Sequence, residues 1–270
     1  MDVRLYWELA RCGFRRTAFY RSAALSGAVT NTFFGFLRAY LFIALYQEAH
    51  AQGQTAVSGY TLPDVLAFTF ITQGLAALIG LWAWWPIAET VQSGQVATDL
   101  SRPYDYQLSW LAQDYGRALF QFVARSTPPF LVGMVAFGVT LPTDPIIWLA
   151  TAPSIVLAIT VSFGWRFMLN LTTFWLVDHR GVAGISLLMT VLLSGFMVPL
   201  AMWPDGLREV VMLLPFASMV AIPIDVFLGK LQGVDLLAVL SLQAFWAVAM
   251  LGLGRLMLAG ALHKLVVQGG

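Results

Sequence analysis

The sequence has few charged residues and a single cysteine. Of its 270 residues, 11% are charged and 59% are hydrophobic, whereas soluble domains carry about 25% charged residues. A soluble chain of this length could not bury so much apolar surface in one core, so we expect the bilayer to be its solvent. The lone cysteine, Cys12, excludes an intrachain disulfide framework and a multi-cysteine metal site. The net charge of +1 gives no electrostatic support for a nucleic-acid partner.

Sequence motifs of common enzymes are also missing. There is no G-x-x-x-x-G-K-[ST] segment, so we expect that the chain does not bind ATP through a P-loop. Neither HExxH nor GxSxG occurs, and the histidines are scattered along the chain. We therefore expect no catalytic residue, no metal site and no cofactor on this chain, which is not an enzyme by itself. The lack of an acidic residue deep in an apolar run argues against a proton-coupled carrier.

The apolar residues are grouped in runs long enough to cross a membrane, which takes about 20 residues. These runs cover residues 23–46, 62–87, 118–141, 146–177, 182–200 and 236–262. Since an open sheet cannot span lipid, each run is expected to be a helix. The sequence predicts an all-α membrane protein with six transmembrane helices. We expect one domain over 1–270, in which 22–264 form the six-span bundle.

Residues 1–21 are amphipathic. Val3, Trp7, Ala10 and Phe14 fall on one helical stripe, and basic residues fall on another. This pattern predicts a helix lying in the membrane interface, with its basic groups toward anionic headgroups. The alternative is an ordinary basic flank of the first span.

The positions of lysine and arginine predict the orientation of the chain. With the N-terminus inside, eleven of these residues fall on cytoplasmic segments or toward the cytoplasmic ends of spans, as Arg125 and Arg255 do. Two fall on outer segments and two, Arg38 and Arg166, deeper within spans, which accounts for all 15. Positive charge accumulates on the cytoplasmic side of membrane proteins. We therefore expect both termini in the cytoplasm and a multi-pass protein of the cytoplasmic membrane.

Two connections between the predicted spans are long. The inner one, 89–117, predicts a short helix over 92–100, with Ser93 as its N-cap and a stop at Arg102-Pro103. Such a helix is shaped to dock on a cytoplasmic partner; the alternative is a solvated connector. The outer connection, 201–234, is apolar and interrupted by three prolines and a glycine: Pro204, Pro215, Pro223 and Gly229. Interrupted helices at membrane depth are tolerated when they pack on protein or line a cavity.

Charged and adaptable side chains within the spans are candidates for a transport pathway. Arg38 and Arg166 interrupt apolar runs, at a cost of about 2.5–3.5 kcal/mol each on insertion scales. They would bind anionic headgroups or an anionic part of a cargo, or else pair with polar neighbours or reach the interface. Met189, Phe196 and Met197 could line a pathway for bulky apolar cargo, or serve only in packing.

Three segments resemble those of a known family. The segment SGQVATDLSRPYDYQLSWLAQDYGRA is similar to the connection between the second and third helices of ABC-2 type permeases. The matching positions are Gly94, Leu100, Arg102, Pro103 and Tyr106, whereas Ser101 departs from the pattern. The outer segment SGFMVPLAMWPDGLREVVMLLPFASMVAIPIDVFLGK resembles the family's hairpin between the fifth and sixth helices. The amphipathic N-terminus is similar to the family's elbow helix, so the resemblance covers the whole chain.

The resemblance implies specific roles. The inner segment would be the coupling helix that rests on the ATPase, and the expected coupling residues are Val96, Asp99, Leu100, Arg102 and Pro103. The outer segment would dip back into the membrane and close the pathway at Pro204, Pro215 and Pro223. The partners would be two copies of an ABC ATPase, which holds ATP and Mg, a second permease, identical or homologous, and membrane lipids. We expect export of an amphipathic, lipid-like or drug-like compound. The alternatives are a membrane enzyme acting on lipid and a non-transporting scaffold.

Overall fold

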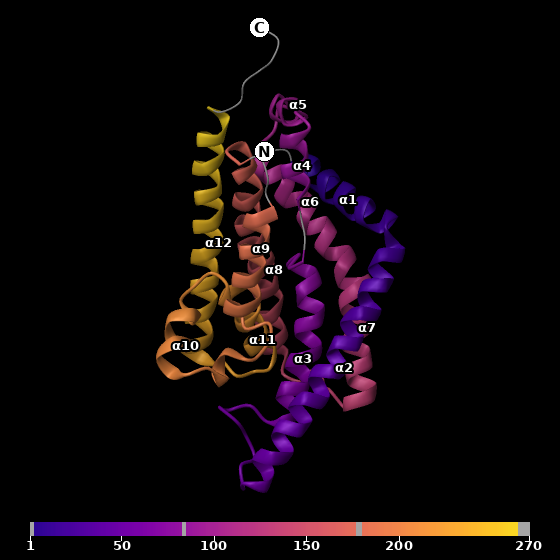
Figure 1. Ribbon diagram of the computed structural model, residues 1–270, viewed down its shortest axis with the longest axis vertical. Helices are drawn as coiled ribbons and strands as arrows, with labels where there is room; N and C mark the ends of the chain where they lie inside the picture. The colour runs from indigo at the N-terminus through magenta and orange to yellow at the C-terminus, as the bar shows by residue number, and fades with distance from the viewer. Residues whose placement is uncertain (1–2, 83–84, 177–179, 264–270) are drawn as a thin grey trace.

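The computed structural model describes residues 3–82, 85–176 and 180–263. In this part the chain is helical, apart from turns and one isolated bridge between Val57 and Tyr60. Most helices run along the long axis of the molecule and alternate in direction (Figure 1). The predicted all-α class agrees with this structure. The predicted ends at residues 1, 177 and 264 lie outside the described residues.

Helix α1 (Val3–Phe19) lies along α6 (Tyr106–Gln121) with almost no space between the two backbones (Figure 1). A Cβ atom added to Gly13 would lie 2.0 Å from the carbonyl oxygen of Gln113, and one added to Gly116 would lie 1.7 Å from that of Ala10. Only glycine permits this approach. The apolar side of α1 is therefore partly covered by protein, although Trp7 remains 66% exposed.

The long helix α2 (Arg21–Ala51) leads through a loop to α3 (Leu62–Leu78), which packs against it. Thr61 and Asp64 form a reciprocal capping box at the start of α3, and Pro63 occupies its first turn. These residues satisfy the free N–H groups of the first turn and fix where the helix begins. The first helix of the predicted second span, 62–87, ends at Leu78, and the next helix begins at Pro86.

The predicted third span is longer than expected and is not uniformly α-helical. The helix begins at Tyr106, where the Asp105 side chain accepts a bond from the Leu108 N–H, and α6 continues into a π-helical turn, Phe122–Ser126, and then α7 (Thr127–Phe137). Pro128 and Pro129 have no N–H to donate to the carbonyls of the preceding turn, which disrupts regular α-helical bonding there.

The second half of the chain centres on α8 (Pro145–Leu171), which continues into a 3-10 turn, Thr172–Phe174. It packs against α12 (Gly233–Leu262) and the outer segment, while α9 (Arg180–Leu193) runs beside it. Among the described residues, three helices are long and apolar enough to cross a membrane: Arg21–Ala51, Pro145–Phe174 and Gly233–Leu262. Two shorter apolar helices cover Leu62–Leu78 and Gly181–Leu193.

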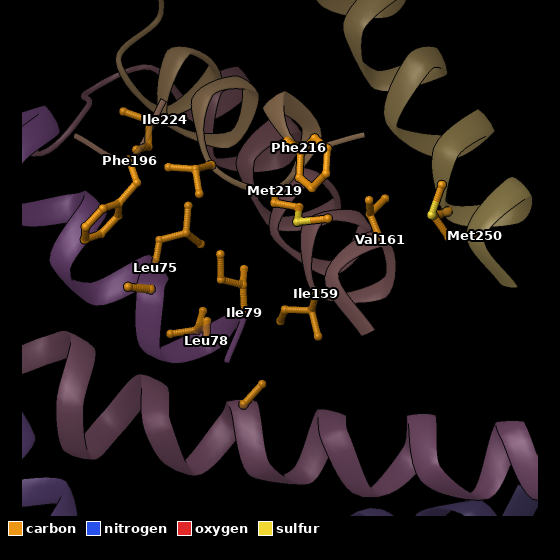
Figure 2. Close-up of a cluster of buried hydrophobic side chains, with 14 of the residues drawn as sticks. Leu75, Leu78, Ile79, Ile159, Val161, Phe196, Phe216, Met219, Ile224 and Met250 are labelled. Atoms are coloured by element: carbon orange, nitrogen blue, oxygen red, sulfur yellow. The ribbon is translucent and has the colours of Figure 1, made fainter. Parts of the chain in front are cut away.

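The main core joins these elements. Leu75 of α3 and Ile79, which caps that helix, lie in one buried cluster with Ile159 and Val161 of α8 and with Met219 of the outer segment (Figure 2). Around it, α2 and α12 carry many exposed large apolar side chains, among them Leu25, Val29, Leu37, Leu41, Leu237, Val248 and Leu256. An apolar exterior this extensive is typical of a surface that faces lipid.

Candidate functional site

Two short helices stand at one end of the molecule, between α3 and α6 (Figure 1). Helix α4 (Pro86–Gln92) ends at Ser93, and α5 (Val96–Leu100) follows after Gly94, whose φ is +75°. The predicted single helix over 92–100 with Ser93 as its N-cap is wrong, because Ser93 is the C-terminal cap of α4. The left-handed backbone at Gly94 separates the two helices.

The predicted coupling residues have different positions on α5. Val96 is only 3% exposed and packs in a cluster with Tyr106, Trp110 and Phe167. The expectation of a surface contact at Val96 is therefore wrong, since this side chain fixes α5 to the bundle. Leu100 is partly buried against the same cluster.

The exposed surface of α5 is mainly polar. Asp99 and Arg102 form an ion pair of 3.4 Å at this surface, and Pro103 is exposed beside them. Ala97 and Thr98 are also exposed. A cytoplasmic partner would therefore meet a polar ridge with small side chains.

Arg38, in the middle of α2, is 8% exposed and reaches the chain that follows α9. Its Nη2 donates to the carbonyl oxygens of Phe196 and Met197 at 2.8 and 2.7 Å, and its Nη1 donates to Thr72 Oγ1 at 3.1 Å. The guanidinium also lies 5.3 Å from the centre of the Phe196 ring. No carboxylate among the described residues forms an ion pair with it. The structure thus brings together three predicted pathway residues, Arg38, Phe196 and Met197.

Arg166, in α8, has a carboxylate partner. Its Nη2 and Nη1 donate to the two oxygens of Asp114 at 2.7 and 3.2 Å, while Arg117 Nε donates to the same carboxylate at 2.6 Å. Arg117 also donates to the carbonyls of Ala77 and Leu78, at the end of α3. The cluster ties α3, α6 and α8 together. Arg166 therefore pairs with polar neighbours, which was one of the alternatives that its position in the sequence left open.

Arg166 also lines a cavity of about 160 Å³ between the end of α3, α8 and α9. Trp82 and Trp165 form aromatic parts of its lining, and Thr190 contributes a hydroxyl. Met189, which was predicted to line the pathway, does not line this cavity and is 39% exposed. The cavity combines apolar faces with a cationic group.

The outer segment holds two short helices, α10 (Asp205–Met212) and α11 (Ala221–Phe227). Pro204 precedes α10, Pro215 lies buried between the helices, and Pro223 lies in the first turn of α11. The Tyr60 hydroxyl donates to Asp225 on α11 and so ties the 52–61 loop to this segment. Burial raises the pKa of Asp225 from its ordinary 3.8 to about 6.

Comparison with known families gives a match over residues 34–269, to a family described as ABC-2 family transporter protein. The chain belongs to this family. Comparisons with curated proteins and with solved structures gave no match. The chain is therefore a multi-pass membrane protein and a permease subunit of an ABC transporter, and the family in general implies an ABC ATPase as partner.

One important residue of the permease was not anticipated. Asp114 is 1% exposed and balances two arginines. Asp114 falls in the predicted inner connection, 89–117, because the apolar run begins only at residue 118. The available signal was the helical continuation from Tyr106 toward the span, with Asp114 and Arg117 three residues apart on that helix.

Proposed function

We propose that this permease forms an ATP-driven exporter with a second permease, identical or homologous, and two copies of an ATPase subunit. The ATPases hold ATP and Mg, and α5 docks on them. The permease has six spans with both termini in the cytoplasm, and α1 lies in the membrane interface. Its location is the cytoplasmic membrane.

The observation that carries this proposal is the connection between α5 and the core. Val96 packs with Ile87 of α4, Trp110 of α6 and Phe167 of α8 in one buried cluster. Gln107 of α6 also donates to the carbonyl oxygen of Leu251 on α12 at 2.9 Å. Because α5 is fixed by buried contacts, a push on its exposed face moves α6 and α8 with it. This is the mechanical property that a coupling helix needs.

The cargo is proposed to be amphipathic, either lipid-like or drug-like. The support is the cavity beside Arg166, where Trp82 and Trp165 offer apolar faces near a cationic group. ATP-dependent uptake by inside-out vesicles tests this, with labelled anionic amphipaths compared with hydrophilic sugars. Uptake restricted to the sugars would exclude an amphipathic cargo.

Docking through α5 is tested with two matched substitutions. Ala97→Glu places a charge on the exposed face of α5, whereas Ala51→Glu places the same charge on the exposed last residue of α2 at the other end of the molecule. Pull-down of the co-expressed ATPase and transport-coupled ATP hydrolysis should both fall for Ala97→Glu and stay normal for Ala51→Glu. Equal recovery of ATPase with both variants would show that coupling runs through another segment. The next candidate, residues 178–181, lies largely outside the described residues.

The orientation and the outer gate are tested by cysteine labelling in a Cys12→Ser background. A membrane-impermeant thiol reagent added outside should label Gln54→Cys but not Ser101→Cys. The outer segment is proposed to dip into the membrane and close the pathway at Pro204, Pro215 and Pro223. The apolar residue Leu213, which is 64% exposed in the single chain, should then be protected as Leu213→Cys. Rapid labelling of that position would show that the segment lies in water.

A further inference from the structure

A second cavity lies where α1 turns into α2, beside α4 and α6. Its volume is about 310 Å³. Three arginines and one glutamate line it, namely Arg16, Arg117, Arg125 and Glu89, so its lining carries a net positive charge. Aromatic side chains also line it, including Tyr20 and Trp85. This cavity adjoins the one beside Arg166, since Trp85 lines both.

The arginines that line this cavity differ in how many hydrogen-bond acceptors they have within the protein. Arg117 is bonded to Asp114 and to the carbonyls at the end of α3. Arg125 has one long hydrogen bond, from Nη2 to Asn31 Oδ1 at 3.4 Å, and its buried Nε has no acceptor among the described residues. A buried donor of a charged group is costly to leave without an acceptor. Arg125 is therefore suited to receive an anionic oxygen from a ligand.

The local backbone presents Arg125 in an unusual way. It lies in the π-helical turn Phe122–Ser126, and such turns often occur at functional sites. Its guanidinium lies against Gly27 of α2, where an added Cβ would come within 2.6 Å of Cζ. Because Gly27 has no side chain, the guanidinium of Arg125 can occupy this space.

The surroundings indicate a lipid as the source of that oxygen. Next to the cavity, α2 exposes Leu25 and Val29, which are 61% and 71% exposed. Tyrosine and tryptophan concentrate at membrane interfaces. Basic pockets between helices on the cytoplasmic side of a membrane are suited to anionic lipid headgroups. A headgroup in the cavity would leave its acyl chains against the apolar face of α2.

We propose that this cavity binds the phosphate of an anionic phospholipid, with Arg125 and Arg16 as its cationic ligands. The lipid would fill the corner between α1 and α2 and hold the interfacial helix to the bundle. Glu89 disfavours a second anionic group nearby, which favours a headgroup with one phosphate. The site rests on the proposed orientation, which puts this end of the bundle at the cytoplasmic side, but it goes beyond the proposed transport function and needs neither an ATPase nor a cargo.

The test is native mass spectrometry of the full-length permease in detergent, titrated with phosphatidylglycerol or with phosphatidylcholine of the same acyl chains. We expect phosphatidylglycerol to bind more tightly. Arg125→Gln should weaken its binding about tenfold, the effect of losing a charged hydrogen bond. Arg16→Gln should also weaken it. Arg15→Gln, the matched control, removes an exposed charge that does not line the cavity and should leave binding unchanged.

Two further measurements distinguish lipid binding from a folding defect and from binding of free phosphate. Gly27→Val keeps every charge but displaces the guanidinium of Arg125, so it should weaken phosphatidylglycerol binding even if Arg125→Gln does not fold. Inorganic phosphate serves as competitor and should not displace the lipid. Equal binding of the two lipids, or equal losses for Arg15→Gln and Arg16→Gln, would overturn the proposal. Displacement by phosphate would identify a free-anion site instead and would also overturn it.

Discussion

Arg38 and Arg166 are both buried in the apolar part of the permease, yet their charges are balanced differently. Arg166 meets Asp114 with two hydrogen bonds, in a cluster that also includes Arg117. Arg38 donates to two backbone carbonyls and a hydroxyl, and lies near aromatic rings. An ion pair in a low dielectric is expensive to separate, whereas carbonyl bonds to irregular chain can be exchanged for others.

We call the cluster of Arg166, Asp114 and Arg117 the fixed joint, and the hydrogen bonds of Arg38 the releasable joint. The Arg166 cluster connects α3, α6 and α8. In the proposed mechanism, α6 and α8 also carry the movement of α5. Arg38 connects α2 to the chain after α9, which leads into the outer segment. We infer that the first joint stays closed through the transport cycle and that the second can open with the outer gate.

The largest loss of stability is expected when the fixed joint is broken. Asp114→Asn leaves Arg166 and Arg117 without their carboxylate, and a stranded buried charge costs about 3–5 kcal/mol of unfolding free energy. The measurement is reversible unfolding of the purified permease in mixed micelles. Asp205→Asn breaks a pair whose Asp205 side chain is 85% exposed and serves as control. If both variants lose the same small amount, Asp114 does not hold the joint.

A smaller effect is expected at Arg38. Arg38→Met removes the charge together with its hydrogen bonds, so no opposite charge is stranded, and we expect a loss of about 1.5–3 kcal/mol. The same unfolding measurement applies, and transport should be impaired because the outer segment loses its attachment to α2. A loss as large as that of Asp114→Asn would remove the distinction between the two joints.

The two joints also show what the sequence could and could not predict. Arg38 and Arg166 stand out by their positions in apolar runs, which predicted that they either pair with polar neighbours or reach the interface. Their partners could not be predicted, because Asp114 lies in a polar-looking helix outside the hydropathy maximum, and the carbonyls of Phe196 and Met197 carry no sequence signal.

The proline positions predicted the breaks around α10 and α11. The left-handed turn at Gly94 was missed, because glycine in a polar segment also fits a continuous short helix.

The outer segment holds a further charged group, the partly buried Asp225, which can avoid the cost of burying its charge by binding a proton. Burial raises the pKa of Asp225 from 3.8 to about 6. A raised pKa means that folding favours the protonated form, so this contribution to stability is complete below about pH 4 and is lost as the pH rises through about 6. The thermal midpoint of the purified permease should therefore fall over this interval.

The comparison at Asp225 uses two variants. Asp225→Asn imitates the protonated acid and should remove this part of the pH dependence. Tyr60→Phe removes the hydroxyl that donates to the carboxylate and should move the transition to higher pH, because that bond favours the ionised form. An unchanged pH profile in Asp225→Asn would show that another group titrates.

The smallest effect on stability is expected at the partly exposed pair Asp99–Arg102. Its atoms are 3.4 Å apart, and the Arg102 side chain is 51% exposed. Exposed pairs of this kind contribute little to folding, because water and salt screen them. Asp99→Asn should therefore leave unfolding unchanged within error, as should Asp205→Asn, which breaks an equivalent i,i+3 pair with Arg208 on α10.

The two variants should differ in function. Asp99 lies on α5, the proposed docking helix, whereas Asp205 lies on the outer segment. A charge at the rim of an interface mainly affects association and its salt dependence. Asp99→Asn should therefore weaken recovery of the ATPase and make it less sensitive to salt, while Asp205→Asn should not. If neither variant changes recovery at any salt concentration, the charges of α5 take no part in docking. The exposed small residues Ala97 and Thr98 would then be left as its contact surface.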